Sequence, residues 1–307
     1  MAHDVVAWVE SPLQLIGAAE WAHAHRTSAA IAGRLTAQMP ETADELLARG
    51  ATFGAMAPYL GIPWGVLARH RHWLVGDGYS GQFRLAASVL RPRRITFLDD
   101  GANAVAFADT LTGRRGYSRP GVAERGLTTR IAPVALDLLH TRALAGRVDV
   151  FTAFALGDER VRALAELGIP VRSHRFEWTR ASAPRATADA RPTTRRVLLG
   201  SARPVDGHLD ADLYLDWIAA EAASSPLTYL PHRRETPAQL AAVAAIPGVR
   251  IAQGHLPAEL VLAGAEGLDV LTLASSTTTT LPLVLDGTGS RIRERVPGQR
   301  HRRRALR

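Results

Sequence analysis

The amino-acid sequence predicts an α/β protein with two parallel-sheet domains, and three observations support this. The chain has 307 residues, which is enough for two domains of about 100–200 residues each. Short apolar runs alternate with Ala-rich helical patterns, which is typical of βαβ units. A stretch rich in Ala, Pro, Thr and Arg, 180–196, interrupts this alternation, which resumes directly after it.

The apolar runs predict the following strands: Val5–Val9, His72–Val75, Ile95–Leu98, Val148–Phe151, Val197–Leu199, Thr228–Leu230, Val249–Ile251 and Val270–Leu273. Helical patterns between them include Leu13–His25, Phe83–Leu90, Glu159–Leu167, Tyr214–Ala223 and Pro237–Ala245.

The domain boundaries follow from this alternation. We expect an N-terminal domain over 1–179, a linker over 180–196 and a C-terminal domain over 197–287. The remaining 288–307 has no apolar face and is expected to be a disordered, Arg-rich tail. Most of the formal net charge of +8 lies in this tail, so we expect no nucleic-acid partner. The tail could contact anionic lipid.

The residue types that are missing exclude several kinds of chemistry. The chain has no Cys, and all 37 of its basic residues are Arg. Thiolate catalysis, a Schiff-base lysine and a phosphate-binding Walker lysine are therefore excluded. The first residues have no basic region followed by a long apolar core, and no apolar stretch reaches membrane-spanning length. We therefore expect a soluble, cytoplasmic protein.

A glycine-rich loop, Gly76–Gly81, offers one functional reading. It reads Gly-x-Gly-x-x-Gly, follows a predicted strand, and is followed about 20 residues later by Asp99 and Asp100. This pattern resembles a dinucleotide-binding loop and keeps an NAD-dependent oxidoreductase or epimerase as an alternative. However, the loop does not follow the first strand, where such a fingerprint normally lies. A tight packing loop is the simpler reading.

Polar residues also follow two other strands of the N-terminal half. Ser11 and Gln14 open the first helix as an N-cap and its N3 partner. Asp99 and Asp100 end a strand, and Gly101 permits a sharp turn. Two neighbouring carboxylates repel each other, which raises one pKa toward the range of a general base.

Three strand ends in the C-terminal half carry groups suited to an anionic ligand. These groups are Gly200, Ser201 and Asp206 after the first, His232 and Arg233 after the second, and Ser275, Ser276 and Thr277 after the third.

Taken together, the motifs of these segments resemble bacterial sialyltransferases of the lipooligosaccharide sialyltransferase and polysialyltransferase type. The resemblance rests on Ser-Pro-Leu-Gln (11–14), Asp-Asp-Gly (99–101), Leu-Leu-Gly-Ser (198–201), Pro-His-Arg-Arg-Glu (231–235) and Ser-Ser (275–276). It implies a GT-B fold, in which two Rossmann-like domains face a cleft. It also implies inverting transfer of sialic acid, or a related nonulosonic acid, from a CMP-activated donor to a cell-surface glycan acceptor.

The resemblance also implies residue roles. Asp100 or Asp99 would be the general base, or Asp206 in the lipooligosaccharide branch. His232, Ser275 and Ser276 would bind the CMP phosphate. No metal and no cofactor besides the CMP-sugar co-substrate are expected. The family has His-Pro where this chain has His232-Arg233. A non-catalytic nucleotide- or glycan-binding relative is the remaining alternative.

Overall fold

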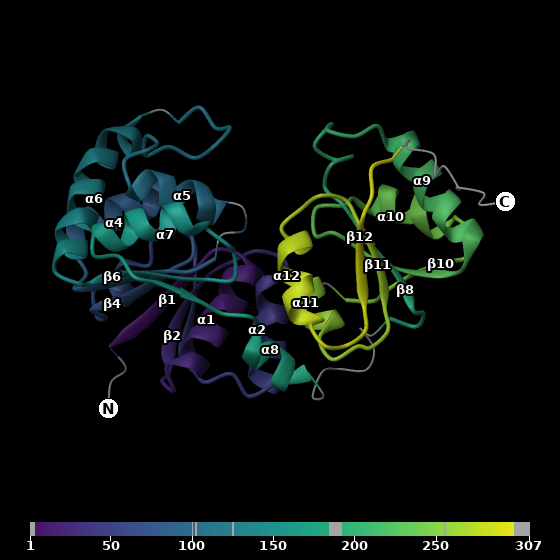
Figure 1. Ribbon diagram of the computed structural model, residues 1–307, viewed down its shortest axis with the longest axis horizontal. Coiled ribbons are helices and arrows are strands. Elements are labelled where there is room, and N and C mark those ends of the chain that lie inside the picture. Colours follow the sequence, from purple (N-terminus) through teal and green to yellow (C-terminus); the bar gives the residue numbers. More distant parts are fainter. Residues whose placement is uncertain are drawn as a thin grey trace. The chain divides into compact units, whose positions relative to one another are not determined.

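The computed structural model of the chain describes residues 4–99, 101, 103–124, 126–183, 192–254 and 256–297. The chain forms two compact units, Met1–Ala186 and Thr187–Arg307, which we call the first and the second unit. Figure 1 shows the elements of each unit. Across the described ranges, no helix is both long enough and apolar enough to cross a membrane.

The first unit is built on a parallel seven-stranded sheet of strand order β3-β2-β1-β4-β5-β6-β7. Its strands are β1 (Val5–Val9), β2 (Ala29–Arg34), β3 (Phe53–Tyr59), β4 (His72–Val75), β5 (Arg94–Phe97), β6 (Val148–Thr152) and β7 (Val171–Ser173). The chain proceeds outward in one direction from β1 to β3 and in the other from β4 to β7. The strand order therefore reverses between β1 and β4.

Helices cover both faces of this sheet, with α4 to α7 on one side and α1, α2 and α8 on the other (Figure 1). They are α1 (Pro12–Ala24), α2 (Met39–Ala48), α3 (Trp64–Leu67), α4 (Gly81–Leu90), α5 (Asn103–Leu111), α6 (Leu127–Leu144), α7 (Asp158–Glu166) and α8 (Glu177–Ala181). Aromatic side chains fill one side of the core: the Trp8 ring packs edge-on against Trp73 and Phe83, at centroid distances of 6.1 and 6.4 Å.

The second unit repeats this plan with a parallel five-stranded sheet of order β10-β9-β8-β11-β12. Its strands are β8 (Arg196–Leu199), β9 (Leu227–Leu230), β10 (Val249–Ile251), β11 (Asp269–Thr272) and β12 (Arg291–Glu294), and its helices are α9 (Ala211–Ser224), α10 (Pro237–Ala244), α11 (Ala258–Leu262) and α12 (Thr277–Val284). Val197 and Leu199 join one hydrophobic cluster and Leu198 another, so β8 is buried on both faces. The strand order reverses between β8 and β11.

All eight strands expected from the apolar runs are present, with ends that differ by at most one residue. Four further strands were not expected: β2, β3, β7 and β12. β2 reads Ala-Ala-Ile-Ala-Gly-Arg, a composition with little β-propensity. Its neighbours β1 and β3 supply the pairing that holds it extended.

The C-terminal tail is shorter than the sequence suggested. We expected disorder over 288–307, but Arg291–Glu294 form β12 and pair in parallel with β11. Ile292 packs against the core of the second unit, and Nε and Nη2 of Arg293 donate to Asp269, at 2.6 and 2.5 Å. A strand with a single apolar residue has no apolar period for sequence analysis to detect. Residues 298–307 lie outside the described residues.

The expected linker over 180–196 is narrower at both ends. Arg180 and Ala181 still belong to α8, and Arg196 is the first residue of β8. The positions 184–191 lie outside the described residues.

A truncation tests the role of β12. A chain that ends at Ser290 loses the burial of Ile292 and the hydrogen bonds to β11. Its free energy of unfolding should therefore fall by about 2 kcal/mol or more. A chain that ends at Pro297 keeps β12 and is the matched control. Urea unfolding measures both, and equal stabilities would contradict the assignment of β12 as part of the sheet.

Candidate functional site

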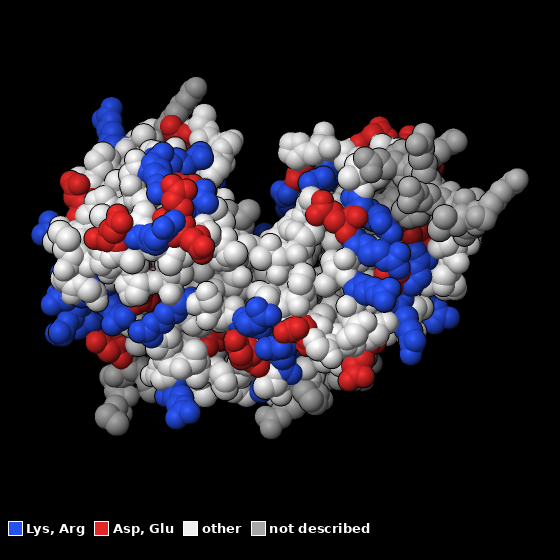
Figure 2. Space-filling view, viewed as in Figure 1, with Lys and Arg blue, Asp and Glu red and all other residues white. Residues whose placement is uncertain are grey.

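Open parallel sheets bind ligands at the carboxyl ends of the strands between which the strand order reverses. In the first unit these are the ends of β1 and β4, and in the second unit the ends of β8 and β11. Figure 2 shows that on the face in view, Arg side chains are interspersed with Asp and Glu on both units.

Two carboxylates occupy the reversal in the first unit. Glu10 follows β1 and accepts a 2.5 Å hydrogen bond from Nη1 of Arg34, at the end of β2. Asp77 follows β4 and forms an ion pair with Arg119. We call these four residues the first-unit site. None of the four was expected as a site residue, although Glu10 directly precedes the motif at 11–14 and Asp77 lies within the loop Gly76–Gly81.

Burial raises the pKa of Glu10 above its usual range, and the neighbouring charge of Asp77 raises it further. Arg34 and a hydrogen bond involving Ser80 act in the opposite direction. The carboxylate is only 14% exposed. A carboxylate held in this way is a stronger base than a solvated one and retains a cation beside it.

The start of α1 positions Glu10. Ser11 lies at the N-cap and Pro12 at the first helical position, as expected, but the Ser11 side chain makes no capping hydrogen bond. Instead, Oε1 of Gln14 accepts from the backbone N–H of Glu10 at 2.7 Å. Gly76 leaves room for the Gln14 side chain, because a Cβ at Gly76 would lie 2.2 Å from Oε1.

Packing accounts for the glycine-rich loop. A Cβ at Gly78 would lie 2.4 Å from Cζ of Phe107, and Gly81 is the first residue of α4. The backbone N–H of Tyr79 donates to Asp77 Oδ1 at 2.9 Å. The loop therefore needs its first two glycines for the close approach of Gln14 and Phe107.

Asp99, which with Asp100 was expected as a candidate base, is buried and hydrogen-bonded. Its carboxylate accepts hydrogen bonds from the Thr152 hydroxyl, from Ala153 N–H at 2.9 Å, and from Nε2 of His174 at 2.8 Å. Asp99 therefore ties the end of β5 to β6 and β7. Gly101 has a φ of +60°, which is the sharp turn expected there. Asp100 lies outside the described residues.

In the second unit, a half-buried carboxylate shapes the loop that carries His232. Glu235 accepts from His232 N–H at 2.6 Å and from the Tyr229 hydroxyl. The loop lies against Gly200, where a Cβ would be 2.3 Å from Glu235 Oε2 and 2.6 Å from His232 N. Burial raises the pKa of Glu235. Gly200 is therefore required by the close approach of the β9 loop to the end of β8.

His232 is neutral near pH 7, because burial and the charges of Arg233 and Arg234 lower its pKa to about 4. Its Nδ1 accepts from the backbone N–H of Arg234 at 3.2 Å. The proton of the neutral ring therefore lies on Nε2, which can donate to a ligand.

Arginines from two loops join this edge of the sheet. Arg234 forms an ion pair with Asp206, a residue expected as an alternative base. Arg203 donates to the carbonyl of Ala274 at 3.1 Å, which ties the loop after β8 to the end of β11. Burial and the charge of Arg234 lower the pKa of Arg233 from its very high usual value. The sequence indicated the two arginines beside His232, but it did not indicate Arg203.

The third part of this edge is the start of α12. Ser275 Oγ and Thr277 Oγ1 lie 2.6 Å apart, and Ser276 is the N-cap residue without a side-chain capping bond. Ser201, at the end of β8, accepts from Arg203 N–H at 3.2 Å. The ends of β8, β9 and β11 thus carry the following polar residues, which we call the second-unit site: Ser201, Arg203, His232, Arg233, Arg234, Ser275, Ser276 and Thr277. Imidazole N–H, guanidinium and helix N-terminus together suit a phosphate group.

Comparison with known proteins adds structural relatives only. No family model and no curated protein sequence matches the chain. Among solved structures, UDP-GlcNAc 2-epimerase from Neisseria meningitidis bound to UDP-GlcNAc is 10% identical, with a TM-score of 0.53 over 94% of this chain and 82% of that one. Staphylococcus aureus MnaA with UDP is 13% identical, with a TM-score of 0.54 over 91% and 76%.

These structures align with both units of the chain, each of which is a doubly wound parallel sheet. The chain has a GT-B-like fold. The expected fold class, two Rossmann-like domains, is therefore confirmed. At these identities the likeness shows the fold of the chain alone.

A substitution at Gly200 tests the packing of the second-unit site. Gly200→Ala places a Cβ against His232 N and Glu235, so the loop must shift, at a cost of about 1–3 kcal/mol. Gly65→Ala, at a position with open space around its Cβ site, should not destabilise the protein. Thermal unfolding measures both variants. A Gly200→Ala protein as stable as the native one would contradict the close approach.

The titration of His232 tests its electrostatic setting. The pKa of His232 is about 4 in the folded protein against 6.5 ordinarily. Its contribution to stability is therefore fully present above pH 6.5 and is lost as the pH falls from 6.5 to 4. Arg234→Gln removes a repelling cation and should raise the pKa. Histidine NMR resonances, assigned with His232→Gln, report it. A midpoint near 6.5 in the native protein would refute this setting.

Proposed function

We propose that this chain is an inverting glycosyltransferase that uses a nucleotide-activated sugar. The observation that carries the proposal is the second-unit site, where a neutral histidine, arginines and the start of α12 meet at the strand ends of a GT-B-like fold. Nucleotide-sugars present a phosphate as leaving group. The site offers donors to that phosphate without requiring a lysine or a thiol, both of which the chain lacks.

The second-unit site would stabilise the leaving phosphate. His232 donates from Nε2 to a phosphate oxygen as the bond from the sugar to that phosphate breaks. Arg233 neutralises the charge that develops, and Ser275, Ser276 and Thr277 donate at the start of α12. Asp206 orients Arg234 through their ion pair. Because Asp206 lies beside the residues that we assign to the leaving phosphate, we give it this positioning role rather than that of the base.

The first-unit site would activate the acceptor. Glu10 takes the proton of the acceptor hydroxyl as that oxygen attacks the anomeric carbon, and attack opposite the leaving phosphate inverts the configuration. The raised pKa of Glu10 favours this proton transfer. Arg34 stabilises the carboxylate before transfer, and Asp77 contributes the charge that raises the pKa.

We further propose a CMP-activated sialic acid, or a related nonulosonic acid, as the donor. The support is the ordered set of short motifs from Ser11 to Ser276, which resembles that of the bacterial sialyltransferases. The acceptor would be a glycan of cell-surface polysaccharide or lipooligosaccharide. The reaction would take place in the cytoplasm, where the Arg-rich C-terminal residues can contact anionic lipid of the inner membrane face.

A second candidate function is epimerisation of a UDP-sugar. It is favoured by the two carboxylates of the first-unit site, Glu10 and Asp77, which could move a proton off and onto a sugar carbon. The two structures described above are a UDP-GlcNAc 2-epimerase and a UDP complex. An NAD-dependent reaction has less support, because packing accounts for the loop Gly76–Gly81.

A pair of substitutions tests the proposed roles. Glu10→Gln should lower kcat for sugar transfer by about 10²–10⁴-fold, since it removes the base, while nucleotide binding stays unchanged. His232→Gln should weaken nucleotide binding as well as turnover. Asp44→Asn, at an exposed acid of α2, is the control and should leave both unchanged. Transfer from CMP-sialic acid and thermal shifts with CMP, UDP and NAD provide the readouts.

Each outcome separates the candidates. A shift with CMP and transfer from CMP-sialic acid support the sialyltransferase proposal. A shift with UDP alone, with interconversion of a UDP-sugar, favours the epimerase, and a shift with NAD alone returns attention to Gly76–Gly81. CMP binding without turnover indicates a non-catalytic relative. Full transfer activity in Glu10→Gln would remove Glu10 from the mechanism.

A further inference from the structure

Away from both sites, a histidine and two glutamates converge between α1 and α8. Glu20 lies on α1, His174 follows β7, and Glu177 is the first residue of α8. One potential ligand atom from each residue lies within 4.8 Å of the other two. Glu20 and His174 are buried, at 2% and 3% exposure, whereas Glu177 is at the surface.

One nitrogen of the His174 ring is held by a hydrogen bond, whereas the other has no partner among the described residues. Nε2–H donates to Asp99 at 2.8 Å, and the ring stacks on Phe151 at a centroid distance of 4.8 Å. The opposite nitrogen, Nδ1, is buried and has no hydrogen-bond partner among the described residues. A buried acceptor left without a partner is costly, so its lone pair points to a missing ligand.

Asp99 and His174 form the outer half of a pattern common at metal centres. A metal-bound histidine almost always donates its second N–H to a carboxylate, which fixes the ring and makes the binding nitrogen more basic. Asp99 is itself held by Thr152 and Ala153. The imidazole is thus preorganised with its free lone pair directed away from Asp99.

Glu20 retains capacity for one more partner. Oε2 accepts from Trp178 N–H at 3.0 Å, while Oε1 accepts from the N–H and the hydroxyl of Thr179, at 2.8 and 2.7 Å. A carboxylate offers about four acceptor positions. Three are used, and the unused one belongs to Oε2. Glu177 accepts from Arg175 N–H at 2.8 Å through Oε2, and its exposed side chain can adjust.

We propose that Nδ1 of His174 and the carboxylates of Glu20 and Glu177 bind a divalent transition-metal ion, with Zn²⁺ as the best fit. One imidazole and two carboxylates are a zinc-type ligand set, whereas Mg²⁺ and Ca²⁺ prefer oxygen alone. Two ligand charges balance the ion. Ligands at about 2.1 Å from Zn²⁺ lie about 3.4 Å apart, a spacing that a small movement of the Glu177 side chain provides.

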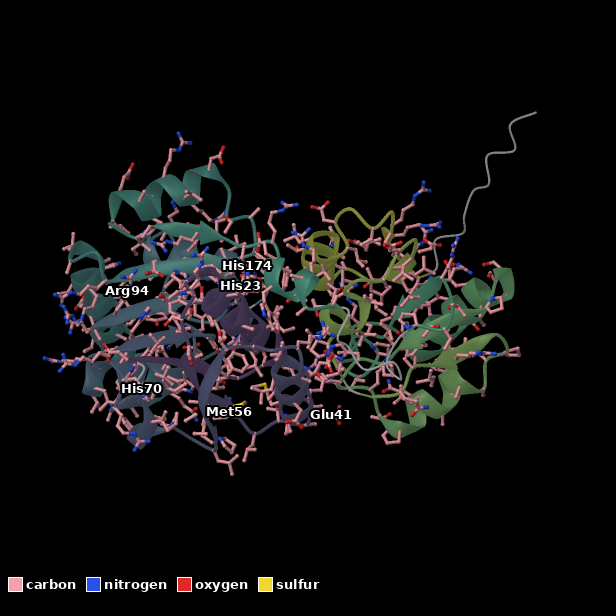
Figure 3. All side chains as sticks on the ribbon, turned by 90° about the horizontal axis from the view of Figure 1, so that it is seen from below. His23, Glu41, Met56, His70, Arg94 and His174 are labelled. Carbon is pink, nitrogen blue, oxygen red and sulfur yellow. The ribbon has the colours of Figure 1, made fainter. Side chains whose placement is uncertain are left out.

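The ion would fasten α8, a short helix near the end of the first unit, to the buried face of α1. This role is structural and does not depend on the proposed transfer reaction. His174, labelled in Figure 3, directly follows β7, which is an edge strand of the sheet. The ion would therefore also join these helices to that edge. His23, labelled in the same figure, lies on α1 and is exposed.

The test uses the untagged full-length protein after chelator treatment, titrated with ZnCl₂ by calorimetry and with Co²⁺ by visible absorption. We expect one Zn²⁺ per chain, an increase in the unfolding temperature on binding, and a Co²⁺ spectrum of an imidazole–carboxylate site. Glu177→Gln should weaken Zn²⁺ binding at least 10-fold. Its unfolding temperature without metal should remain native, because Glu177 is exposed. His23→Ala is the control for adventitious binding by a surface histidine.

The affinities of Glu177→Gln and His23→Ala for Zn²⁺ decide whether the proposed site exists. Weaker Zn²⁺ binding in Glu177→Gln, with unchanged binding in His23→Ala, supports the site. Three results would overturn it: no binding of Zn²⁺ to the native protein, the same affinity in Glu177→Gln, or loss of binding in His23→Ala. His174→Gln should abolish the Co²⁺ spectrum. Should that variant fail to fold, the result with Glu177→Gln still decides.

Discussion

The second-unit site depends on the hydrogen bonds that the carboxylate of Glu235 accepts. It lies at the end of a hydrogen-bonded chain that runs from the Tyr214 hydroxyl through the Tyr229 hydroxyl. Its other oxygen holds the backbone N–H of His232. This arrangement is possible only because Gly200 has no side chain. The histidine is therefore positioned by its main chain, and its ring remains available for a ligand while burial keeps it uncharged.

The two units carry side chains of different charge at their strand ends. The first unit places carboxylates at its strand reversal, each with an arginine beside it, and burial raises the pKa of Glu10. The second unit places arginines and a neutral histidine at its strand ends. A base and an anion site are the two requirements of sugar transfer from a phosphate. Each unit carries one of the two groups that the proposed transfer requires.

Much of the fold could be predicted from the sequence, but the site only in part. Buried apolar strands such as Val5–Val9 leave a clear pattern, whereas β2 and β12 owe their extended form to neighbouring strands. The strand ends at Gly200, His232 and Ser275 could be predicted because each directly follows an apolar run in the sequence. The hydrogen bonds of Asp99 could not be predicted, because its partners Thr152, Ala153 and His174 are over 50 residues away in sequence. The burial that raises the pKa of Glu10 is likewise a property of packing.

The central claim is that the ends of β8, β9 and β11 bind the phosphate of a nucleotide. Hydrogen–deuterium exchange with and without CMP or UDP tests it most directly, because it locates binding without assuming a reaction. We predict slower exchange on nucleotide binding at the amides of 200–203, 232–235 and 275–278, with little change in the loop Gly76–Gly81. Two results would contradict this claim: slower exchange in that loop alone, or unchanged exchange throughout the second unit.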